Sequence, residues 1–412
     1  MAHGCHLKLI ETPCLYRVAS DDLYEVDEVG FEFLARAASP EGVLSDDSEF
    51  VDFCLQEGIL TQLPQPAQEP DQMPHVPPIV RQSPLPSLRY LELQITDECN
   101  LSCRHCYIES SRCNRMDVGQ ICAVLKEFED MQGLRALITG GEPTMHPDFL
   151  RLNDMLPRFC LRKLLFTNGL LLDSHMLDTL NVDEIVISVD GLKDAHEAIR
   201  GAGTFNRTLK AIEASIEHGF DTSVSTMIHA LNVDDFEQMQ GMFTGMGVKD
   251  WIVDVAVVAG NLRQHTSLKV SPMIGGKLLK YGFGGEIHSG HATVRSESDH
   301  REFACGYHLM SVLADGRAAK CAFYADQPVG NVKDGLLNCW QQIKPIPLDS
   351  LKCNDCEEKL TCRGGCRYRA STFGDPLGKD FYRCHMERQE REEEREEERE
   401  EEKKERGGSA PL

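Results

Sequence analysis

Short apolar runs alternate with helical spacings of apolar residues over residues 88–260. The runs that predict strands lie at 88–96, 135–140, 162–167, 183–190, 221–228 and 250–258. The helical spacings lie at 117–131, 147–159, 204–218 and 233–246. Six repeats of a strand followed by a helix predict a parallel sheet with right-handed crossovers, either a partial barrel or an open doubly wound sheet. Because ligands of such sheets bind at the carboxyl ends of the strands, those ends are where chemistry is expected.

The pattern before this region is different. Residues 7–63 contain two short strand patterns and one amphipathic helix pattern, followed by a second helix with apolar residues at Phe50, Val51, Phe53, Cys54 and Leu55. This order predicts a small winged-helix-like domain over residues 1–63.

Composition divides the rest of the chain. Residues 64–86 hold eight of the nineteen prolines and predict a semi-rigid linker, because proline cannot continue a helix or a central strand. The α/β core is expected at 87–262, with a connecting segment at 263–299. Residues 300–385 are rich in cysteine and poor in periodic pattern, which is typical of a region held by metal. Residues 386–412 form a Glu/Arg-rich tail with no apolar stripe and predict a solvated segment.

Charge and composition exclude several classes of function. The chain has 412 residues and a net charge of −23, which argues against nucleic acid and anionic membranes as partners. No apolar run reaches the roughly 18 residues that cross a bilayer, and no secretory signal precedes the first domain, so we expect a cytoplasmic protein. Seventeen cysteines are many for such a protein. Without export, metal or cluster ligation explains them better than disulfides.

Three cysteines follow the first predicted strand of the core. Cys99, Cys103 and Cys106 lie within eight residues on a strand-to-helix loop. Three thiolates there can bind three irons of a [4Fe–4S] cluster and leave the fourth iron open to a small molecule with an amino and a carboxylate group. A structural zinc site is the alternative, but zinc prefers four ligands and paired CxxC spacing.

The CxxxCxxC motif at this position resembles the radical S-adenosylmethionine (SAM) superfamily. Further resemblances follow in order at the ends of the next strands: GGEP at 140–143, FTNG at 166–169, ISVDG at 187–191, and a stretch from His196 through Arg200-Gly201 to Phe205. The resemblance implies a partial (β/α)6 TIM-like barrel. The positions that it assigns to SAM binding are Tyr107, Gly140, Gly141, Glu142, Thr167, Asn168, Ser188, Asp190 and Arg200.

A second cysteine pattern resembles the SPASM domain, a C-terminal extension of radical SAM enzymes that carries up to two auxiliary [4Fe–4S] clusters. The resemblance assigns one cluster to Cys353, Cys356, Cys362 and Cys384, and three ligands of another to Cys305, Cys321 and Cys366. The fourth ligand of that cluster stays open: Asp299, His300, solvent or a substrate thiolate. A purely structural cluster and a double zinc ribbon are the alternatives.

The N-terminal region resembles a PqqD-like element, which binds the leader of a precursor peptide as an added strand. An unrelated N-terminal domain is the alternative, and its acidity counts against DNA binding. Together the resemblances imply a radical SAM/SPASM enzyme that modifies a ribosomally made peptide, with a flavodoxin or ferredoxin as electron donor.

The bond that such an enzyme would form stays open. Thioether or carbon–carbon crosslinks, epimerisation and side-chain oxidation are all compatible with the sequence. Sulfatase-maturing relatives carry an acidic residue after the second SPASM cysteine, whereas this chain has Ala322, which disfavours formylglycine formation. A tetrapyrrole-modifying SPASM enzyme and a non-enzymatic iron–sulfur or zinc scaffold are the remaining alternatives.

Overall fold

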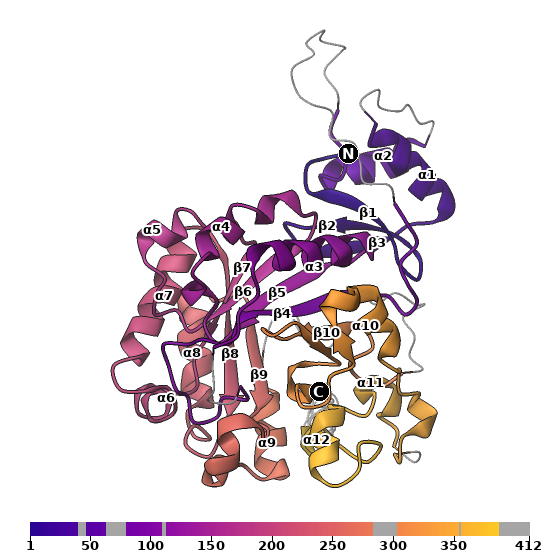
Figure 1. The fold of residues 1–412 in the computed structure, drawn as a ribbon. Coiled ribbons are helices and arrows are strands. Elements are labelled where there is room, and N and C mark those ends of the chain that lie inside the picture. The colour runs from indigo at the N-terminus through magenta and orange to yellow at the C-terminus, as the bar shows by residue number, and fades with distance from the viewer. Residues whose placement is uncertain (40–46, 63–79, 109–112, 283–302, 354–355, 387–412) are drawn as a thin grey trace, which may run out of the picture.

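Three structural regions follow one another along the chain in the computed structural model (Figure 1). The structure describes residues 1–39, 47–62, 80–108, 113–282, 303–353 and 356–386. Most of the predicted linker at 64–86, the end of the connecting segment and nearly all of the predicted tail lie outside these residues. Within them, no helix combines the length and apolar character needed to cross a membrane.

The N-terminal region is an antiparallel sheet with two helices beside it. Its elements are β1 (Cys5–Leu9), β2 (Pro13–Arg17), β3 (Asp22–Glu25), α1 (Glu28–Ala37) and α2 (Ser48–Gln56). The sheet order is β1-β2-β3, so the prediction of two strands missed one. The third strand forms because a turn brings its residues back along β2, where Tyr24 pairs with Leu15. Both helices begin at an aspartate whose side chain accepts a backbone N–H, Asp27 for α1 and Asp47 for α2.

The middle region is an α/β unit whose strands all run parallel. These strands are β4 (Tyr90–Thr96), β5 (Arg135–Gly140), β6 (Arg162–Thr167), β7 (Glu184–Ser188), β8 (Asp221–Ile228) and β9 (Trp251–Val255). The helices are α3 (Val118–Asp130), α4 (Phe149–Asn153), α5 (Ser174–Leu177), α6 (Lys193–Arg200), α7 (Phe205–Glu217), α8 (Phe236–Met246) and α9 (Pro272–Leu279). The six strands pair in chain order, as expected for consecutive strand–helix repeats.

The strands and helices predicted for this region are found in the structure, and their first and last residues differ slightly from the predicted ones. All six strands form within or at the predicted bounds. The helix predicted at 147–159 is broken into α4 and a 3-10 turn at Leu156–Arg158. Pro157 explains the break, because its ring nitrogen has no hydrogen to continue the helical bonding.

The C-terminal region extends the same sheet. Its elements are β10 (Leu309–Val312), β11 (Arg317–Ala319), β12 (Gly330–Asn331), α10 (Leu336–Gln342), α11 (Lys359–Cys362) and α12 (Arg367–Thr372). Strand β10 pairs parallel to β4, and the sheet order is β12-β11-β10-β4-β5-β6-β7-β8-β9. The cysteine-rich region therefore continues the sheet of the middle region instead of forming a separate unit (Figure 1).

The N-terminal region packs against the amino ends of the parallel strands β5 and β6. Arg162, the first residue of β6, donates to the backbone oxygens of Val18 and Ala19, and Arg135 at the start of β5 pairs with Asp21 at 2.6 Å. The predicted catalytic motifs lie at the opposite, carboxyl ends of these strands (Figure 1). Strand β6 therefore runs from the surface that contacts the N-terminal region to the end of the sheet that carries the predicted motifs.

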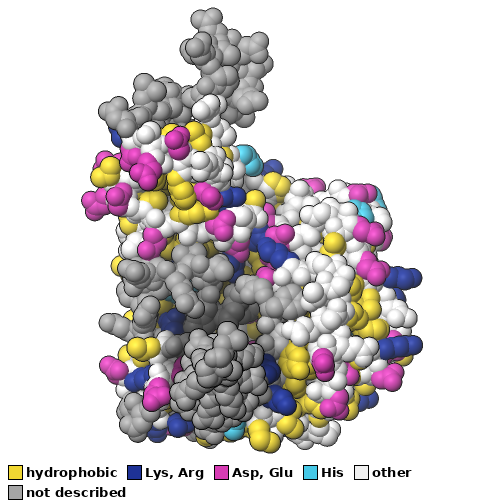
Figure 2. Space-filling view, turned by 180° about the vertical axis from the view of Figure 1, so that it is seen from behind, with side chains coloured by type: hydrophobic (Ala, Val, Ile, Leu, Met, Phe, Trp, Pro, Cys, Tyr) yellow, Lys and Arg dark blue, Asp and Glu magenta, His cyan; other side chains and the backbone are white. Residues whose placement is uncertain are grey.

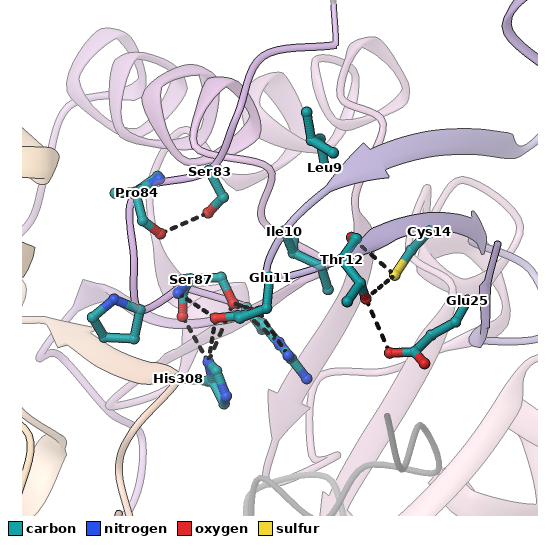
Figure 3. A network of polar contacts seen from close by, with 12 residues as sticks. Leu9, Ile10, Glu11, Thr12, Cys14, Glu25, Ser83, Pro84, Ser87 and His308 are labelled. Carbon is teal, nitrogen blue, oxygen red and sulfur yellow. Dashed lines mark hydrogen bonds and ion pairs between the residues drawn. The ribbon is translucent and has the colours of Figure 1, made fainter. Parts of the chain in front are cut away.

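A buried carboxylate joins all three regions (Figure 3). Glu11, between β1 and β2, accepts hydrogen bonds from the backbone and hydroxyl of Ser87 at 2.8 Å each. It also pairs with Arg89 at 2.8 Å, with both side chains at most 5% exposed, and lies 4.0 Å from His308 just before β10. Ser83 of the predicted linker is buried and bonded to Leu9, so the described part of that linker is packed.

Replacing Glu11 by Gln is expected to lower the free energy of unfolding by about 3–5 kcal/mol, because it breaks the buried ion pair between Glu11 and Arg89. Although burial opposes ionisation, Arg89 lowers the pKa of Glu11 from 4.5 to about 2. Its contribution to stability is therefore complete above the ordinary pKa and is lost as pH falls from 4.5 toward 2. Denaturant titrations across this pH range should show that the free energy of unfolding falls less steeply with decreasing pH in the variant than in the unaltered chain. Glu213→Gln on the exposed face of α7 is the control, and an equal effect of both changes would contradict the prediction.

Candidate active site

The loop after β4 carries the three motif cysteines. All three are free thiols; Cys103 is buried, and Cys99 and Cys106 are partly exposed. Burial raises the pKa of Cys103 to about 11, and the nearby thiols of Cys106 and Cys99 act in the same direction. Cys106 and Leu101 pack against the apolar cluster that contains Cys103.

Backbone contacts with the segment after β9 fix this loop. Asn261 donates from its side chain to the Cys103 oxygen at 2.9 Å and from its backbone to the Cys106 oxygen at 2.8 Å. Gly260 has φ +48°, and a Cβ there would lie 2.4 Å from the Cys106 oxygen. Only glycine allows this approach, so residue 260 is part of the support for the loop although it lies far from the motif in sequence.

The donor set fits an iron–sulfur cluster. Thiolates are the ligands that such clusters take from proteins, and here three free thiols share one loop. Among the residues that the structure describes, no three His, Cys, Asp or Glu side chains are arranged to hold a single metal ion. A four-iron cluster is larger than one ion, so its ligands stand farther apart than those of a single metal.

The GGEP motif joins the ends of β5 and β6. Glu142 is fully buried, and it accepts hydrogen bonds from the Thr144 hydroxyl at 2.6 Å, the Thr167 hydroxyl at 2.8 Å and the Asn168 backbone at 2.8 Å. Burial raises the pKa of this carboxyl. A Cβ on Gly141 would lie 2.2 Å from the Glu98 oxygen, so the motif also lies directly against the cysteine loop. Contacts of this motif with SAM stay a prediction.

The FTNG motif reaches the cysteine loop from β6. The Asn168 side-chain amide donates to Asn100 at 2.7 Å and lies 4.0 Å from the Cys99 sulfur. Ser188 is half-buried at the end of β7. The predicted SAM-binding positions on β5, β6 and β7 therefore lie at the same end of the sheet as the cysteines, as expected for parallel strands.

The carboxylate of Asp190 is completely enclosed. One oxygen accepts from the Met227 backbone at 2.9 Å, and the other receives Arg200 at 2.6 Å and His105 at 3.1 Å. Although burial opposes ionisation, Arg200 and His105 hold the pKa of Asp190 well below its usual range. Because His105 lies between Cys103 and Cys106, this carboxylate ties the cysteine loop to the last residue of α6.

The backbone of Asp190 is equally well bonded. Its N–H donates to the His196 Nδ1 at 3.2 Å, and its oxygen accepts from His229 at 2.9 Å and Asn232 at 3.4 Å. Burial lowers the pKa of His196 and of His229 to about 4, so both rings are neutral near pH 7. Asp190 is therefore the centre of a buried polar group, and its assignment to SAM binding stays a prediction.

Residues 93–242, which contain these motifs, match the Radical SAM superfamily. This segment is a radical SAM domain. The mycofactocin maturase MftC of Mycolicibacterium smegmatis is 26% identical over 319 residues, which cover 70% of this chain and 80% of that relative. MftC of Mycobacterium ulcerans is 33% identical over 156 residues, 35% of this chain and 42% of the relative.

A solved structure matches nearly the whole chain. Streptococcus suis SuiB bound to S-adenosylmethionine has a TM-score of 0.65 at 15% identity and covers 92% of this chain and 98% of its own. At this identity the likeness shows a shared fold. The shared part extends beyond the radical SAM domain, which alone spans residues 93–242.

The cysteines after the radical SAM domain form two groups. Cys305 is hydrogen-bonded to Cys366, which together with Lys320 and the Arg367 N–H lowers the pKa of the Cys305 thiol to about 6. Burial raises the pKa of Cys321 to about 12, and Cys305 acts in the same direction. Cys353 and Cys356 pack in one apolar cluster with Leu348 and Leu351. Burial raises the pKa of Cys384, and Asp380, Cys356 and Cys353 act in the same direction. Cys362 is partly exposed at the end of α11.

Tyr107 links the radical SAM domain to the first of these groups. Its hydroxyl donates to Glu92 on β4 at 3.3 Å and accepts from Gln94 at 3.2 Å, and its ring packs edge-on against Phe323 at 5.9 Å. Glu92 also accepts from Ser311 on β10 and from the backbone of Ala322, beside Cys321. The predicted cluster loop and the Cys321 loop thus share one buried carboxylate.

Sequence reasoning missed His105, Glu92 and Asn261. Glu92 had a detectable signal, because a charged residue inside the apolar run of β4 must find buried partners. His105 lies inside the cysteine motif, but its partner is eighty-five residues away and only the fold brings them together. No feature of the sequence indicated that Asn261 would contact the cysteine loop.

Proposed function

We propose that the chain is a radical SAM peptide maturase. In this proposal Cys99, Cys103 and Cys106 hold the SAM-binding [4Fe–4S] cluster. The GGEP, FTNG and ISVDG loops, with Tyr107 and Arg200, orient SAM. When bound, the cluster and SAM would supply radical chemistry that removes a hydrogen atom from the substrate, and the chain would position the substrate and exclude water.

Two auxiliary clusters belong to the same proposal. Cys353, Cys356, Cys362 and Cys384 would hold one, and Cys305, Cys321 and Cys366 would supply three ligands of the other in a SPASM domain. Thiolates suit this role because they bind soft iron and because nearby charges tune the reduction potential. A flavodoxin or ferredoxin would supply electrons in the cytoplasm.

One observation favours a peptide over a small molecule as the substrate. The N-terminal region packs on the amino ends of the barrel strands, and the radical SAM motifs lie at the carboxyl ends. Strand β6 has six residues, so about 20 Å separates the two surfaces. An extended peptide can contact both, whereas a single small planar molecule cannot. SuiB, whose fold the chain shares, has also been solved bound to its precursor peptide SuiA.

The N-terminal region would bind the leader of that peptide as a PqqD-like element. Strand β3 lies at the edge of its sheet and, among the described residues, pairs only with β2. An edge strand offers free backbone groups on alternate residues to an added strand. This mode of binding supplies affinity through the main chain and selectivity through side-chain pockets.

Anaerobic reconstitution tests the proposal. Three [4Fe–4S] clusters would give about twelve irons per chain, and dithionite-reduced protein should convert SAM to methionine and 5′-deoxyadenosine. Iron is measured colorimetrically and 5′-deoxyadenosine by mass spectrometry. Four irons or fewer would contradict the SPASM part of the proposal. Absence of 5′-deoxyadenosine from fully loaded protein would contradict the radical SAM part.

A further inference from the structure

An apolar cavity lies next to β3. It has a volume of about 210 Å³ and lies between the sheet and helices α1 and α2. Its lining includes Leu15, Leu34, Phe50, Phe53 and Ile59. A cavity of about 150 Å³ holds a benzene molecule, so this one has room for a single leucine or phenylalanine side chain. Phe53 is 45% exposed at its mouth, although large apolar side chains are normally covered.

The acidic rim of this cavity is defined here as Glu25, which lines it, and the nearby Asp22 and Glu57, which do not. Glu25, the last residue of β3, lines the cavity and is exposed, with the neutral Thr12 hydroxyl as its hydrogen-bond donor at 3.0 Å (Figure 3). Asp22 at the other end of β3 and Glu57 beside Tyr24 share one cation, Arg17, at 4.0 and 3.8 Å. Two carboxylates thus face a single arginine, and negative charge remains in excess along the strand.

The acidity is concentrated in this region. Residues 1–62 contain thirteen Asp and Glu against three Lys and Arg, which accounts for nearly half of the net charge of −23. Lys8 is buried and donates to Gly133, so it does not offset charge at the surface. Figure 2 shows acidic side chains interspersed with hydrophobic ones on the N-terminal region, at the top of the view. Such a surface favours partners of positive charge.

From the cavity and its rim we infer that the N-terminal region recognises a basic, amphipathic peptide segment. The segment adds as a strand to β3, places one large apolar side chain in the cavity, and carries Lys or Arg on either side of it. Because side chains alternate along a strand, the apolar anchor and the basic residues need not be adjacent. The inference rests on the proposed peptide-maturase function and names the chemistry of its leader.

Three fluorescein-labelled peptides of equal length test this inference against the full chain. The first has a central Leu-Thr-Phe flanked by Lys and Arg. The second has Glu in place of every Lys and Arg, and the third has Ser in place of Leu and Phe. Anisotropy should give a Kd for the first peptide about tenfold or more below that of either other peptide. The difference in Kd between the first and the second peptide should become smaller as the salt concentration rises.

Two charge-reversal variants locate the site. Glu25→Lys should weaken binding of the basic peptide by about fivefold, since it replaces an attraction by a repulsion at an exposed position. Glu213→Lys makes the same change in net charge on α7 and should leave the Kd unaltered. Equal binding of the first two peptides, or an equal effect of both variants, would overturn the inference.

Binding is measured without SAM, so the test does not depend on turnover. If no peptide binds while the reduced enzyme cleaves SAM, the inference fails and the radical SAM assignment stands. If the basic peptide binds tightly but SAM is never cleaved, the inference stands and the proposed catalytic function fails.

Discussion

Replacing Cys103 by Ala is expected to abolish reductive cleavage of SAM. Cys103 is the most buried of the three motif cysteines, and its thiol is near those of Cys99 and Cys106. A cluster that loses one of its three thiolate ligands is expected to be lost from this loop. Iron should fall from about twelve to about eight per chain, and the amount of 5′-deoxyadenosine should fall to background.

A matched substitution separates this effect from general damage. Cys122→Ala removes a thiol of similar size from α3, where the side chain packs partly buried against the core outside all the motifs. This variant should keep its iron and its SAM cleavage. Cleavage that survives in Cys103→Ala would show that the loop after β4 does not hold the catalytic cluster.

The sequence predicted the strands well because the physical signal was local. Strands β5, β6 and β7 each contain an apolar run that ends at a glycine or polar motif, and a strand buried on both faces needs little else to be recognised. The order of the motifs also predicted which residues lie at one end of the sheet. Parallel strands make that inference nearly independent of detailed packing.

Contacts between distant segments could not be predicted in the same way. From its sequence neighbours Glu11 would be expected to be exposed to solvent, because it lies just before a strand that begins with proline. In the structure its carboxylate is buried against Arg89 and Ser87. Strand β3 was missed because Asp22–Glu25 is only four residues long and half polar. Both features depend on how the N-terminal region packs, which no local pattern encodes.

The same limit applies to Asp190. Sequence resemblance places it among residues that bind SAM, but its oxygens already accept three donors from the chain, and the residue is fully buried. Two of these donors belong to His105 in the cysteine loop and to Arg200 on α6. The arrangement suits a residue that positions the cluster loop.

Replacing Asp190 by Asn is expected to lower the iron content of the catalytic cluster. The substitution leaves the Arg200 guanidinium buried against a neutral amide and weakens the tie to His105, so the loop between Cys103 and Cys106 loses its anchor. Breaking a buried ion pair costs about 3–5 kcal/mol of stability. Iron should fall toward about eight per chain, with the auxiliary signals retained in electron paramagnetic resonance spectra of the reduced protein.

A nearby carboxylate provides the control. Asp235 accepts a hydrogen bond from the Leu192 backbone at 2.7 Å, and among the described residues its carboxylate forms no hydrogen bond to the cysteine loop. Asp235→Asn should therefore keep its iron. The Kd for SAM distinguishes the two roles of Asp190. A positioning role predicts that SAM binding is lost only together with iron, because Asp190 is fully buried and its oxygens are bonded to donors of the chain. Full iron loading together with weakened SAM binding would contradict this role.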